Sequence, residues 1–326
     1  MRLEVATRTP PKHPTHDPSQ VLRVARSYYL DDESKVAIAE RELLSRWQVA
    51  RILEDARASG LVRISVGDPA EIDSVTGAKI TSALGLAETI VVGRSRKLGL
   101  EPSLDSVGEA LARYLSATVL EGDAVGLTWS RAIESMAAHL DHLAPCDVVQ
   151  LAGALTLTGN RMGSVEIIRH VARLAHGTAY PIYAPLVVES PDIRRALEQQ
   201  AEIAACLKRA ADLSIAVVSV GTWSEEGSSL YPLVPAKLAQ QAAAAGAVGE
   251  ISGRVFTGDG ALALAALDDR VLGISAEQLR AVPHIVATSY GAHRVDATIA
   301  AARAGYAHTL IIDSALADAI TEKLGL

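Results

Sequence analysis

The hydrophobic positions between residues 45 and 57 have the spacing of an amphipathic helix. Ser45 and Gln48 at the start of this segment fit the S-x-x-Q capping box, so the pattern predicts a helix that begins at Ser45. Basic and polar residues occupy the other side. The four apolar residues that share one face follow at i, i+3, i+4 and i+7: Val49, Ile52, Leu53 and Ala56.

Two shorter helical patterns precede this helix, at residues 19 to 30 and 34 to 41. The gap of residues 42 to 44 leaves room only for the tight turn of a helix-turn-helix, whose second helix reaches base edges with its N-terminal residues. The alternative is a helical hairpin that only packs or dimerises. The residues that we expect at the DNA are Ser34, Lys35, Ser45, Arg46, Trp47, Gln48 and Arg51.

This stretch resembles the N-terminal helix-turn-helix of the SorC/DeoR-type sugar-binding transcriptional regulators. The chain departs from the family pattern at the turn, where the family has Leu-Gly and this chain has Glu42 and Leu43. Because glycine serves such a turn by tolerating positive φ, Leu43 predicts either a strained turn or a one-residue rearrangement. Trp47 is also unusual at a position facing DNA. The matching residues are Tyr28, Tyr29, Ile38, Ala39, Ser45, Arg46, Val49, Arg51, Leu53, Ala56, Arg57, Gly60, Val62 and Ile64.

From residue 89 onward, short β-branched runs alternate with longer helical segments. Such alternation implies right-handed crossovers and predicts an α/β fold with a doubly wound, mostly parallel sheet. The expected strands are residues 89–93, 124–127, 147–151, 184–190, 213–221, 283–289 and 308–313. The expected helices lie near residues 104–120, 131–143, 163–175, 191–209, 235–245, 292–304 and 315–324.

These patterns divide the chain into four parts. Residues 1–18 are rich in Pro, Thr and His and are expected to form a mobile arm, and residues 19–66 an all-α helix-turn-helix domain. Residues 67–88 are expected to form a linker helix, and residues 89–326 an effector domain. Segments such as GDAVGLTWSRAI and GAVGEISGRVF extend the family resemblance to this last part. The resemblance implies the fold of glucosamine-6-phosphate deaminase and ribose-5-phosphate isomerase.

Composition and charge agree with this division. The chain has 326 residues, of which 49% are hydrophobic and only 4% aromatic, as is typical of parallel sheets buried on both faces. The net charge is −7, but residues 1–66 carry 11 Lys and Arg against 9 Asp and Glu. With two cysteines, no C-x-x-C motif and no apolar run of about 18 residues, we expect no disulfide framework, no cysteine zinc site, no membrane span and a cytoplasmic protein.

The loops after the expected strands are where a doubly wound sheet binds small ligands. Thr128, Ser130 and Arg131 lead into a helix and could cradle a phosphate, although a helix cap with a solvated Arg is the alternative. Gly153 stands in the next such loop. Asn160 or the neighbouring Arg161 could replace a cationic contact that family members have at the position of Ala152, or could be surface residues.

Further candidates lie toward the C-terminus. Gly253 and Gly291 accompany charged residues in segments that resemble the pocket of the family. Trp223 ends an apolar strand and could stack on a sugar or only pack. We expect four charged residues from separate segments to converge on one pocket and to favour an anionic, hydroxylated ligand: Arg131, Glu250, Arg254 and Arg294.

The sequence therefore predicts a DNA-binding transcriptional regulator of carbohydrate metabolism. Its partners would be operator DNA, a phosphorylated sugar, polyol or related small anion, and at least one further copy of itself, with a tetramer implied by the resemblance. No cofactor or metal is expected, since His139 and His142 have no third ligand nearby. The alternatives are an isomerase-like or deaminase-like enzyme and a protein that assembles through the hairpin. The effector, the operator and the sign of regulation stay open.

Overall fold

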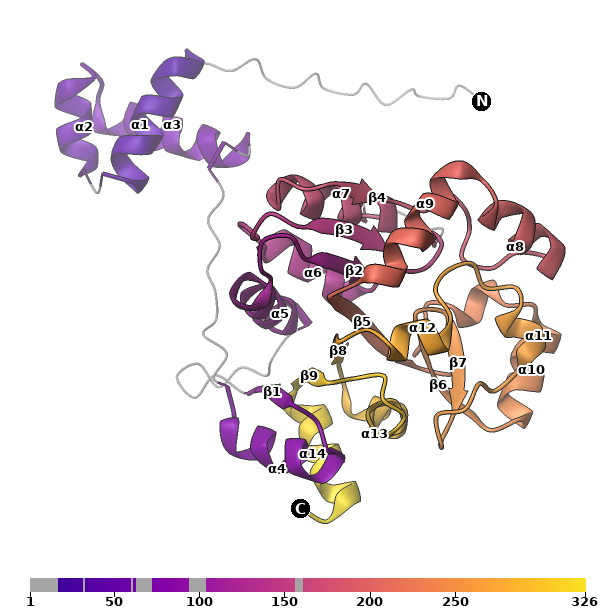
Figure 1. Cartoon of the computed structure of the whole chain (residues 1–326). Helices are drawn as coiled ribbons and strands as arrows, with labels where there is room; N and C mark the ends of the chain where they lie inside the picture. Colours follow the sequence, from indigo (N-terminus) through magenta and orange to yellow (C-terminus); the bar gives the residue numbers. More distant parts are fainter. Residues whose placement is uncertain (1–16, 32, 60, 63–71, 94–103, 156–160) are drawn as a thin grey trace, which may run out of the picture. The chain divides into compact units, whose positions relative to one another are not determined.

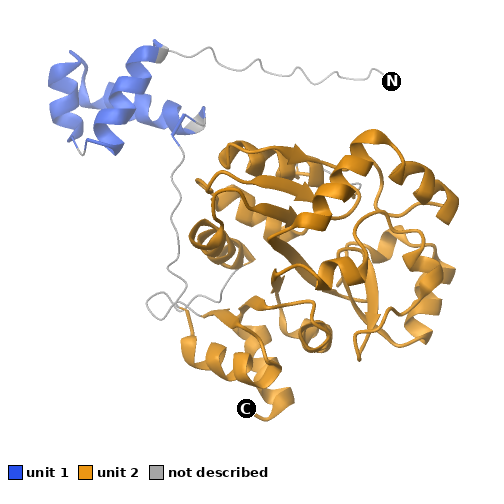
Figure 2. Ribbon diagram, in the orientation of Figure 1, with its two compact units in different colours: residues 1–67 blue, residues 68–326 orange. Residues whose placement is uncertain are grey.

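The computed structural model describes residues 17–31, 33–59, 61–62, 72–93, 104–155 and 161–326. The chain divides into two compact units, unit 1 with residues 1–67 and unit 2 with residues 68–326 (Figure 2). Most of the expected mobile arm lies outside the described residues. Its last two residues are part of the first helix and its cap, because Asp17 caps this helix and Pro18 begins it.

Unit 1 contains the three expected helices, α1 (Pro18–Tyr29), α2 (Lys35–Arg41) and α3 (Arg46–Ala58). The predicted capping box is present, because the Gln48 amide donates to the Ser45 hydroxyl at 3.2 Å and the Ser45 amide donates to the Gln48 side chain at 2.8 Å. The sequence also predicts a small strand that closes this helical stretch at Ile64, and Ile64 lies outside the described residues. The apolar faces of the helices meet in one core that includes Val24, Ile38, Val49, Ile52 and Ala56.

The turn between α2 and α3 is strained at Leu43. This residue has a φ of 55°, in the left-handed region, and is 93% exposed. A β-carbon in this region crowds the following carbonyl oxygen, and no packing of the Leu43 side chain compensates for that cost. Of the two outcomes that the sequence predicted for this turn, the structure has the strained turn.

We expect Leu43→Gly to stabilise unit 1 by about 1 kcal/mol, because glycine adopts positive φ without the steric cost of a β-carbon. Thermal unfolding followed by circular dichroism would measure the change. The control is Leu30→Gly, at another exposed leucine without positive φ, which should stabilise nothing. A Leu43→Gly variant that melts below the wild type would contradict the assigned turn geometry.

Unit 2 is built on a nine-stranded sheet. Seven strands pair in parallel in the order β1-β9-β8-β5-β2-β3-β4 (Figure 1). Two more, β6 and β7, form an antiparallel hairpin that continues from the end of β5. The bounds are β1 (Glu88–Val92), β2 (Ala124–Leu127), β3 (Asp147–Gln150), β4 (Ala179–Tyr180), β5 (Ile215–Thr222), β6 (Ala247–Ile251), β7 (Arg254–Thr257), β8 (His284–Ser289) and β9 (Thr309–Asp313).

Six of the seven predicted strands are confirmed. The prediction for residues 184–190 is wrong, since this segment makes only isolated bridges, from Pro185 to Ala154 and from Val187 to Val271. Strands β4, β6 and β7 were not predicted. The three are short or interrupted by glycine, so their hydrophobic runs are too weak to mark a strand.

Helices cover both faces of the sheet, as the doubly wound prediction requires. One hydrophobic cluster joins α5 (Leu104–Thr118), α6 (Arg131–His139) and α7 (Ser164–Leu174) to one face. A second cluster covers the other face. It includes α4 (Ser74–Leu84), α9 (Ala201–Arg209), α12 (Ala276–Arg280), α13 (Val295–Arg303) and α14 (Ser314–Leu324).

Two helix predictions need correction. The helix expected over residues 191–209 is two helices, α8 (Pro191–Glu198) and α9, separated at residues 199–200. The expected linker helix is α4, which packs against β1 and α14 within unit 2. The packing is close, since a β-carbon added at Gly77 would lie 2.4 Å from the Thr89 carbonyl oxygen. The remaining helices of unit 2 are α10 (Ala236–Ala244) and α11 (Ala265–Asp268), with 3-10 turns at residues 210–212, 231–233 and 292–294.

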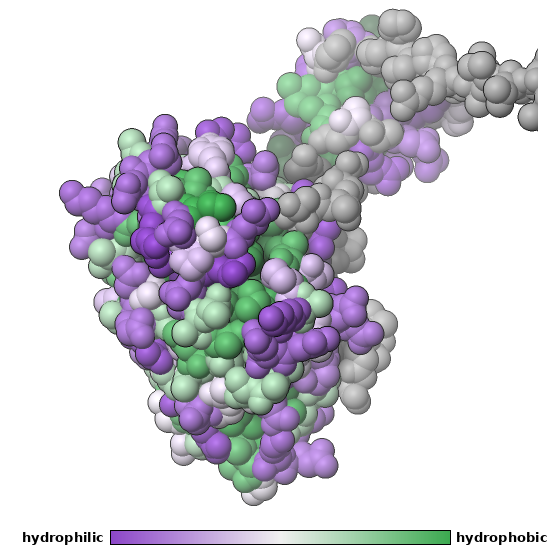
Figure 3. All heavy atoms as spheres, turned by 90° about the vertical axis from the view of Figure 1, so that its right-hand side faces the viewer, coloured by the Kyte–Doolittle hydropathy of each residue, from purple (hydrophilic) through white to green (hydrophobic). Residues whose placement is uncertain are grey.

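One face of unit 2 carries apolar side chains on its surface. Figure 3 shows a central hydrophobic patch among polar side chains on the side where α8 and α11 lie in Figure 1. Helix α8 has no buried residue, and Ile193 and Ala196 are exposed on it. An amphipathic helix normally buries its apolar side, so α8 leaves part of that side uncovered.

Candidate functional site

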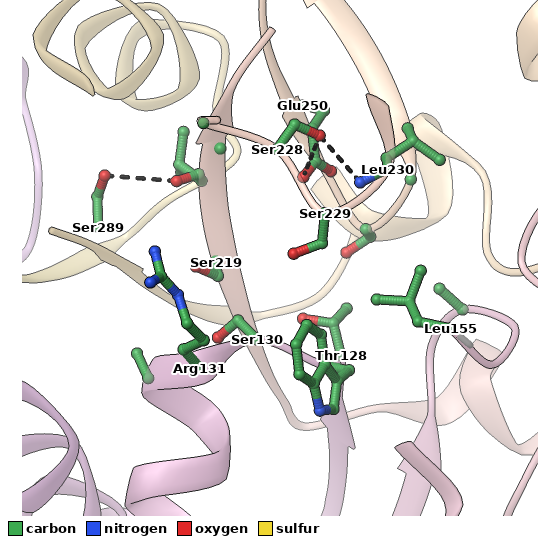
Figure 4. Close-up of a pocket in the computed structure, with 18 of the residues that line it drawn as sticks. Thr128, Ser130, Arg131, Leu155, Ser219, Ser228, Ser229, Leu230, Glu250 and Ser289 are labelled. Carbon is green, nitrogen blue, oxygen red and sulfur yellow. Dashed lines mark hydrogen bonds between the residues drawn. The ribbon is translucent and has the colours of Figure 1, made fainter. Parts of the chain in front are cut away.

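A pocket of about 320 Å³ opens at the carboxyl ends of the parallel strands (Figure 4). Its walls come from the segments that follow β2, β3, β5 and β8, and from the turn of the β6–β7 hairpin. Strands β2 and β5 are neighbours in the sheet, and the connections proceed in opposite directions from them. The pocket therefore lies at the topological switch point, where α/β sheets bind ligands.

Seven of the ten predicted effector residues line this pocket. They come from four separate segments of the sequence, as expected from the parallel topology. Figure 4 shows the side chains of Arg131 and Glu250 on opposite walls. The seven residues are Thr128, Ser130, Arg131, Gly153, Glu250, Gly253 and Arg294.

The loop after β2 leads into the N-terminus of α6. The Ser130 hydroxyl accepts a hydrogen bond from the Ile133 amide at 3.1 Å, so this hydroxyl is the helix cap. Arg131, the first residue of α6, is exposed, and no hydrogen bond or ion pair engages it within the described residues. The segment thus presents one uncommitted guanidinium beside the positive end of a helix.

Two buried hydroxyls in the pocket wall lack a hydrogen-bond partner among the described residues. They belong to Thr128, at the end of β2, and to Ser252, in the hairpin turn. Ser252 has a φ of 52° and precedes Gly253 at 80°, so a strained turn holds that hydroxyl in place. Leaving a buried hydroxyl unpaired costs about 1–3 kcal/mol. A bound ligand with hydroxyl or oxyanion groups would recover part of that cost.

Glu250 places a carboxyl group in the same pocket. Burial raises the pKa of Glu250 to about 7, although the Ser228 hydroxyl, the Gly253 amide and the Arg294 guanidinium oppose the rise. The Ser228 hydroxyl donates to the Glu250 carboxylate at 3.3 Å. A β-carbon at Gly221 would approach the same carboxylate to 2.8 Å, so this glycine leaves the space that Glu250 occupies.

Arg294 both lines the pocket and hydrogen-bonds to its wall. It lines the pocket but is only 8% exposed, and its guanidinium donates to the Tyr290 and Gly227 carbonyl oxygens. Burial and the neighbouring Arg131 lower the pKa of Arg294. Arg294 therefore fixes two loops of the wall and adds positive charge to the pocket.

The prediction that Arg254 joins the pocket is wrong. Its side chain is 3% exposed and donates to the Ile274 carbonyl oxygen at 2.8 Å, the Gly273 carbonyl oxygen at 3.0 Å and the Asp268 carboxylate at 2.9 Å. The reason is strand alternation, because Arg254 pairs with Ile251 in the hairpin and Glu250 is one residue away from that register. Adjacent strand residues point to opposite faces.

Two of the other candidates do not line the pocket, and the prediction for a third is not tested. Gly291 does not line the pocket, and its amide donates to the Asp313 carboxylate at 2.8 Å. Asn160 lies outside the described residues. Trp223 is a packing residue, since it is buried, its indole N–H donates to the Ala239 carbonyl oxygen, and its ring contacts Tyr231 edge to face.

Several residues of the pocket were missed in the sequence. Trp129 lines it under the guanidinium of Arg161, which lies 4.9 Å from the ring centroid and also pairs with Glu134 at 2.6 Å. The others are four serines. Two of them stand near the ends of predicted strands, and this position was the signal that could have found them. The other two lie in a loop without a strand pattern. The serines concerned are Ser219, Ser228, Ser229 and Ser289.

In unit 1 some of the predicted DNA-facing side chains already make contacts within the unit, and others are exposed. The hydroxyls of Ser34 and Ser45 accept amide protons as helix caps, and the side-chain oxygen of Gln48 is engaged by Ser45. Lys35 lies over the ring of Tyr28 at 5.2 Å. The remaining three, Arg46, Trp47 and Arg51, are exposed, and the Arg51 guanidinium lies 5.2 Å from the Trp47 ring centroid.

Comparison with known proteins places the chain in a family. Residues 68–322 match the sugar-binding domain family (Sugar-bind), and the chain belongs to it. The chain is 29% identical to the deoxyribonucleoside regulator of Bacillus subtilis strain 168 over 313 residues, 93% of this chain and 97% of that protein. It is 21% identical to the sorbitol operon regulator of Klebsiella pneumoniae, over 91% of this chain and 96% of that protein.

Solved structures share the fold. The full-length sorbitol operon regulator SorC of Klebsiella pneumoniae has a TM-score of 0.70 at 19% identity, over 94% of this chain and 99% of that one. A domain of a protein of Arthrobacter aurescens TC1 that is described as a possible sugar-binding transcriptional regulator has a TM-score of 0.68 at 24% identity, over 77% of this chain and 98% of that one. The resemblance to SorC/DeoR-type regulators is thus confirmed. None of the described helices is long and apolar enough to cross a membrane.

Proposed function

We propose that the chain is a transcriptional regulator of carbohydrate metabolism that binds operator DNA through unit 1 and a small hydroxylated anion through unit 2. The observation that carries the proposal is the pocket, whose lining residues include an exposed arginine that no described group engages and two residues with unpaired buried hydroxyls. An enzyme would have no need of the helix-turn-helix in unit 1. The names of the relatives, regulators of deoxyribonucleoside and sorbitol genes, agree with this function.

The pocket suggests how the effector is held. Arg131 and the α6 N-terminus would bind an acidic group, such as the phosphate of a sugar or polyol phosphate. Thr128 and Ser252 would pair with its hydroxyls, and Glu250 would accept or donate a further hydrogen bond according to its protonation. A ligand of this kind would offer a partner to each of these four groups.

A thermal-shift screen tests the effector site. Sugar phosphates, free polyols and inorganic phosphate should give different shifts of the melting temperature. A ligand that binds only the folded state raises apparent stability by RT ln(1 + [L]/Kd), so the tightest ligand gives the largest shift. Arg131→Ala should weaken the best ligand by about 1.5–3 kcal/mol, the cost of a charge-assisted hydrogen bond. The control is Arg113→Ala on α5, an exposed arginine outside the pocket. An unchanged Kd in Arg131→Ala would remove Arg131 from the site.

The proposal for DNA rests on the exposed start of α3. Arg46, Trp47 and Arg51 would face the major groove, with Ser34 and Lys35 near the phosphates. A single helix-turn-helix reads a short half-site, so we also propose a dimer or tetramer. The uncovered apolar side of α8 is a surface through which unit 2 would associate.

One observation favours a second candidate, an isomerase-like or deaminase-like enzyme. A pocket carboxyl with a pKa of about 7, as at Glu250, is what a general base needs. Proton exchange into aldose and ketose phosphates, followed by NMR in deuterated water, separates the two functions. Exchange that Glu250→Gln abolishes would favour the enzyme, and ligand binding without exchange favours the regulator.

A further inference from the structure

Two large apolar side chains are exposed on either side of the Ser45 cap. Leu43, in the turn, is 93% exposed and Trp47, in the first turn of α3, is 67% exposed. Neither belongs to the hydrophobic core of unit 1. Apolar side chains of this size are usually buried in a folded domain, and Leu43 also has an unfavourable φ. The folded unit buries neither side chain, which points to a contact outside it.

The Trp47 ring is held in position for such a contact. Arg51, one turn further along α3, places its guanidinium 5.2 Å from the ring centroid, in a cation–π arrangement. This contact limits the rotamers of both residues before any partner binds. Arg46 is exposed beside Trp47 and has no ion pair in the described part of unit 1, so positive charge flanks the apolar surface.

We infer that Trp47 and Leu43 read thymine methyl groups in the major groove, an inference that rests on the proposed DNA binding. The C5-methyl group of thymine is the apolar feature that distinguishes base pairs in that groove, and it is read by apolar contact. The exposed cations beside the surface, Arg46 and Arg51, favour DNA over an apolar protein partner. The N-terminal end of the second helix is the part of a helix-turn-helix that reaches base edges.

Deoxyuridine substitution tests this inference directly. The full-length chain first selects its preferred sequence from a random duplex pool. Each thymine of that sequence is then replaced by deoxyuridine, which removes one methyl group and leaves base pairing unchanged. At one or more positions in each half-site the wild-type Kd should rise about fourfold, which corresponds to roughly 0.8 kcal/mol per buried carbon.

Variants assign the effect to these side chains. Trp47→Ala should bind thymine and deoxyuridine duplexes equally at the sensitive position, and Leu43→Gly should do the same at that position or a neighbouring one. Leu30→Ala, at a leucine that is 72% exposed at the end of α1, is the matched control and should keep the full methyl effect. Because all three side chains are exposed, circular dichroism should show the same folded helix content.

The outcomes are distinguishable. If the pool yields a preferred sequence but no thymine is sensitive to loss of its methyl group, the inference is overturned and DNA binding stands. If no sequence is enriched, the proposed function itself fails. If Trp47→Ala changes the sedimentation coefficient without DNA and keeps the methyl effect, the surface binds a second copy of the chain, and the inference is overturned.

Discussion

Arg254→Ala is expected to destabilise unit 2 by about 3 kcal/mol, because it removes a buried guanidinium and leaves its hydrogen-bond partners unpaired. The guanidinium of Arg254 donates to the Gly273 and Ile274 carbonyl oxygens and to the Asp268 carboxylate. Asp268 is the last residue of α11, and Gly273 and Ile274 lie in the segment that follows it; this region packs against β7 of the β6–β7 hairpin. Without the arginine, buried carbonyl groups would lose their donors and the hairpin would lose its attachment.

The measurement is urea unfolding followed by tryptophan fluorescence. A Trp47→Phe background confines the signal to Trp129 and Trp223, which both lie in unit 2. Arg254→Lys keeps the charge but not the planar fork and should lose part of the stability. Arg113→Ala, at a solvent-exposed ion pair, should change it by less than about 0.5 kcal/mol. Arg254→Ala with normal stability and weakened effector binding would instead make Arg254 a ligand residue.

Local signals in the sequence predicted much of the fold. The Ser45 and Gln48 capping box fixed the start of α3, because a cap depends only on residues within one turn. The β-branched runs predicted six parallel strands, because strands buried on both faces must be almost wholly apolar. The position of the pocket followed from the same pattern, since parallel strands bring their carboxyl ends to one edge.

The β6–β7 hairpin shows what local sequence signals cannot predict. Glu250 and Arg254 lie four residues apart, and the sequence placed both in the pocket. Which of them faces the ligand depends on the register between β6 and β7, and a shift of one residue would exchange the two faces. Register is set by the packing of β6 on β5 and by the turn at Ser252 and Gly253, so it is a tertiary property. Strand propensity alone cannot supply it.

Glu250→Gln is expected to remove a pH dependence of the stability of unit 2. Burial raises the pKa of Glu250 from 4.5 to about 7 in the folded chain, so the folded state holds a proton that the unfolded state releases. The stabilisation from this group is complete below pH 4.5 and is lost as pH rises through 7. Since Glu250 is partly accessible from the pocket, we expect a loss of about 2–3 kcal/mol over this range.

The same proton should govern the affinity for an anion. A neutral Glu250 does not repel a phosphate or carboxylate held by Arg131, whereas the ionised form does. The wild-type affinity should therefore fall as pH rises above 7, and binding below that pH should take up little or no proton. Glu250→Gln should bind with a Kd that is constant from pH 6 to 8, after correction for the ligand's own ionisation.

Calorimetry in buffers of different ionisation enthalpy measures both the Kd and the number of protons taken up on binding. An equal pH dependence in the wild type and Glu250→Gln would mean that another group, such as His293 with its pKa lowered by burial and Arg294, controls the pocket.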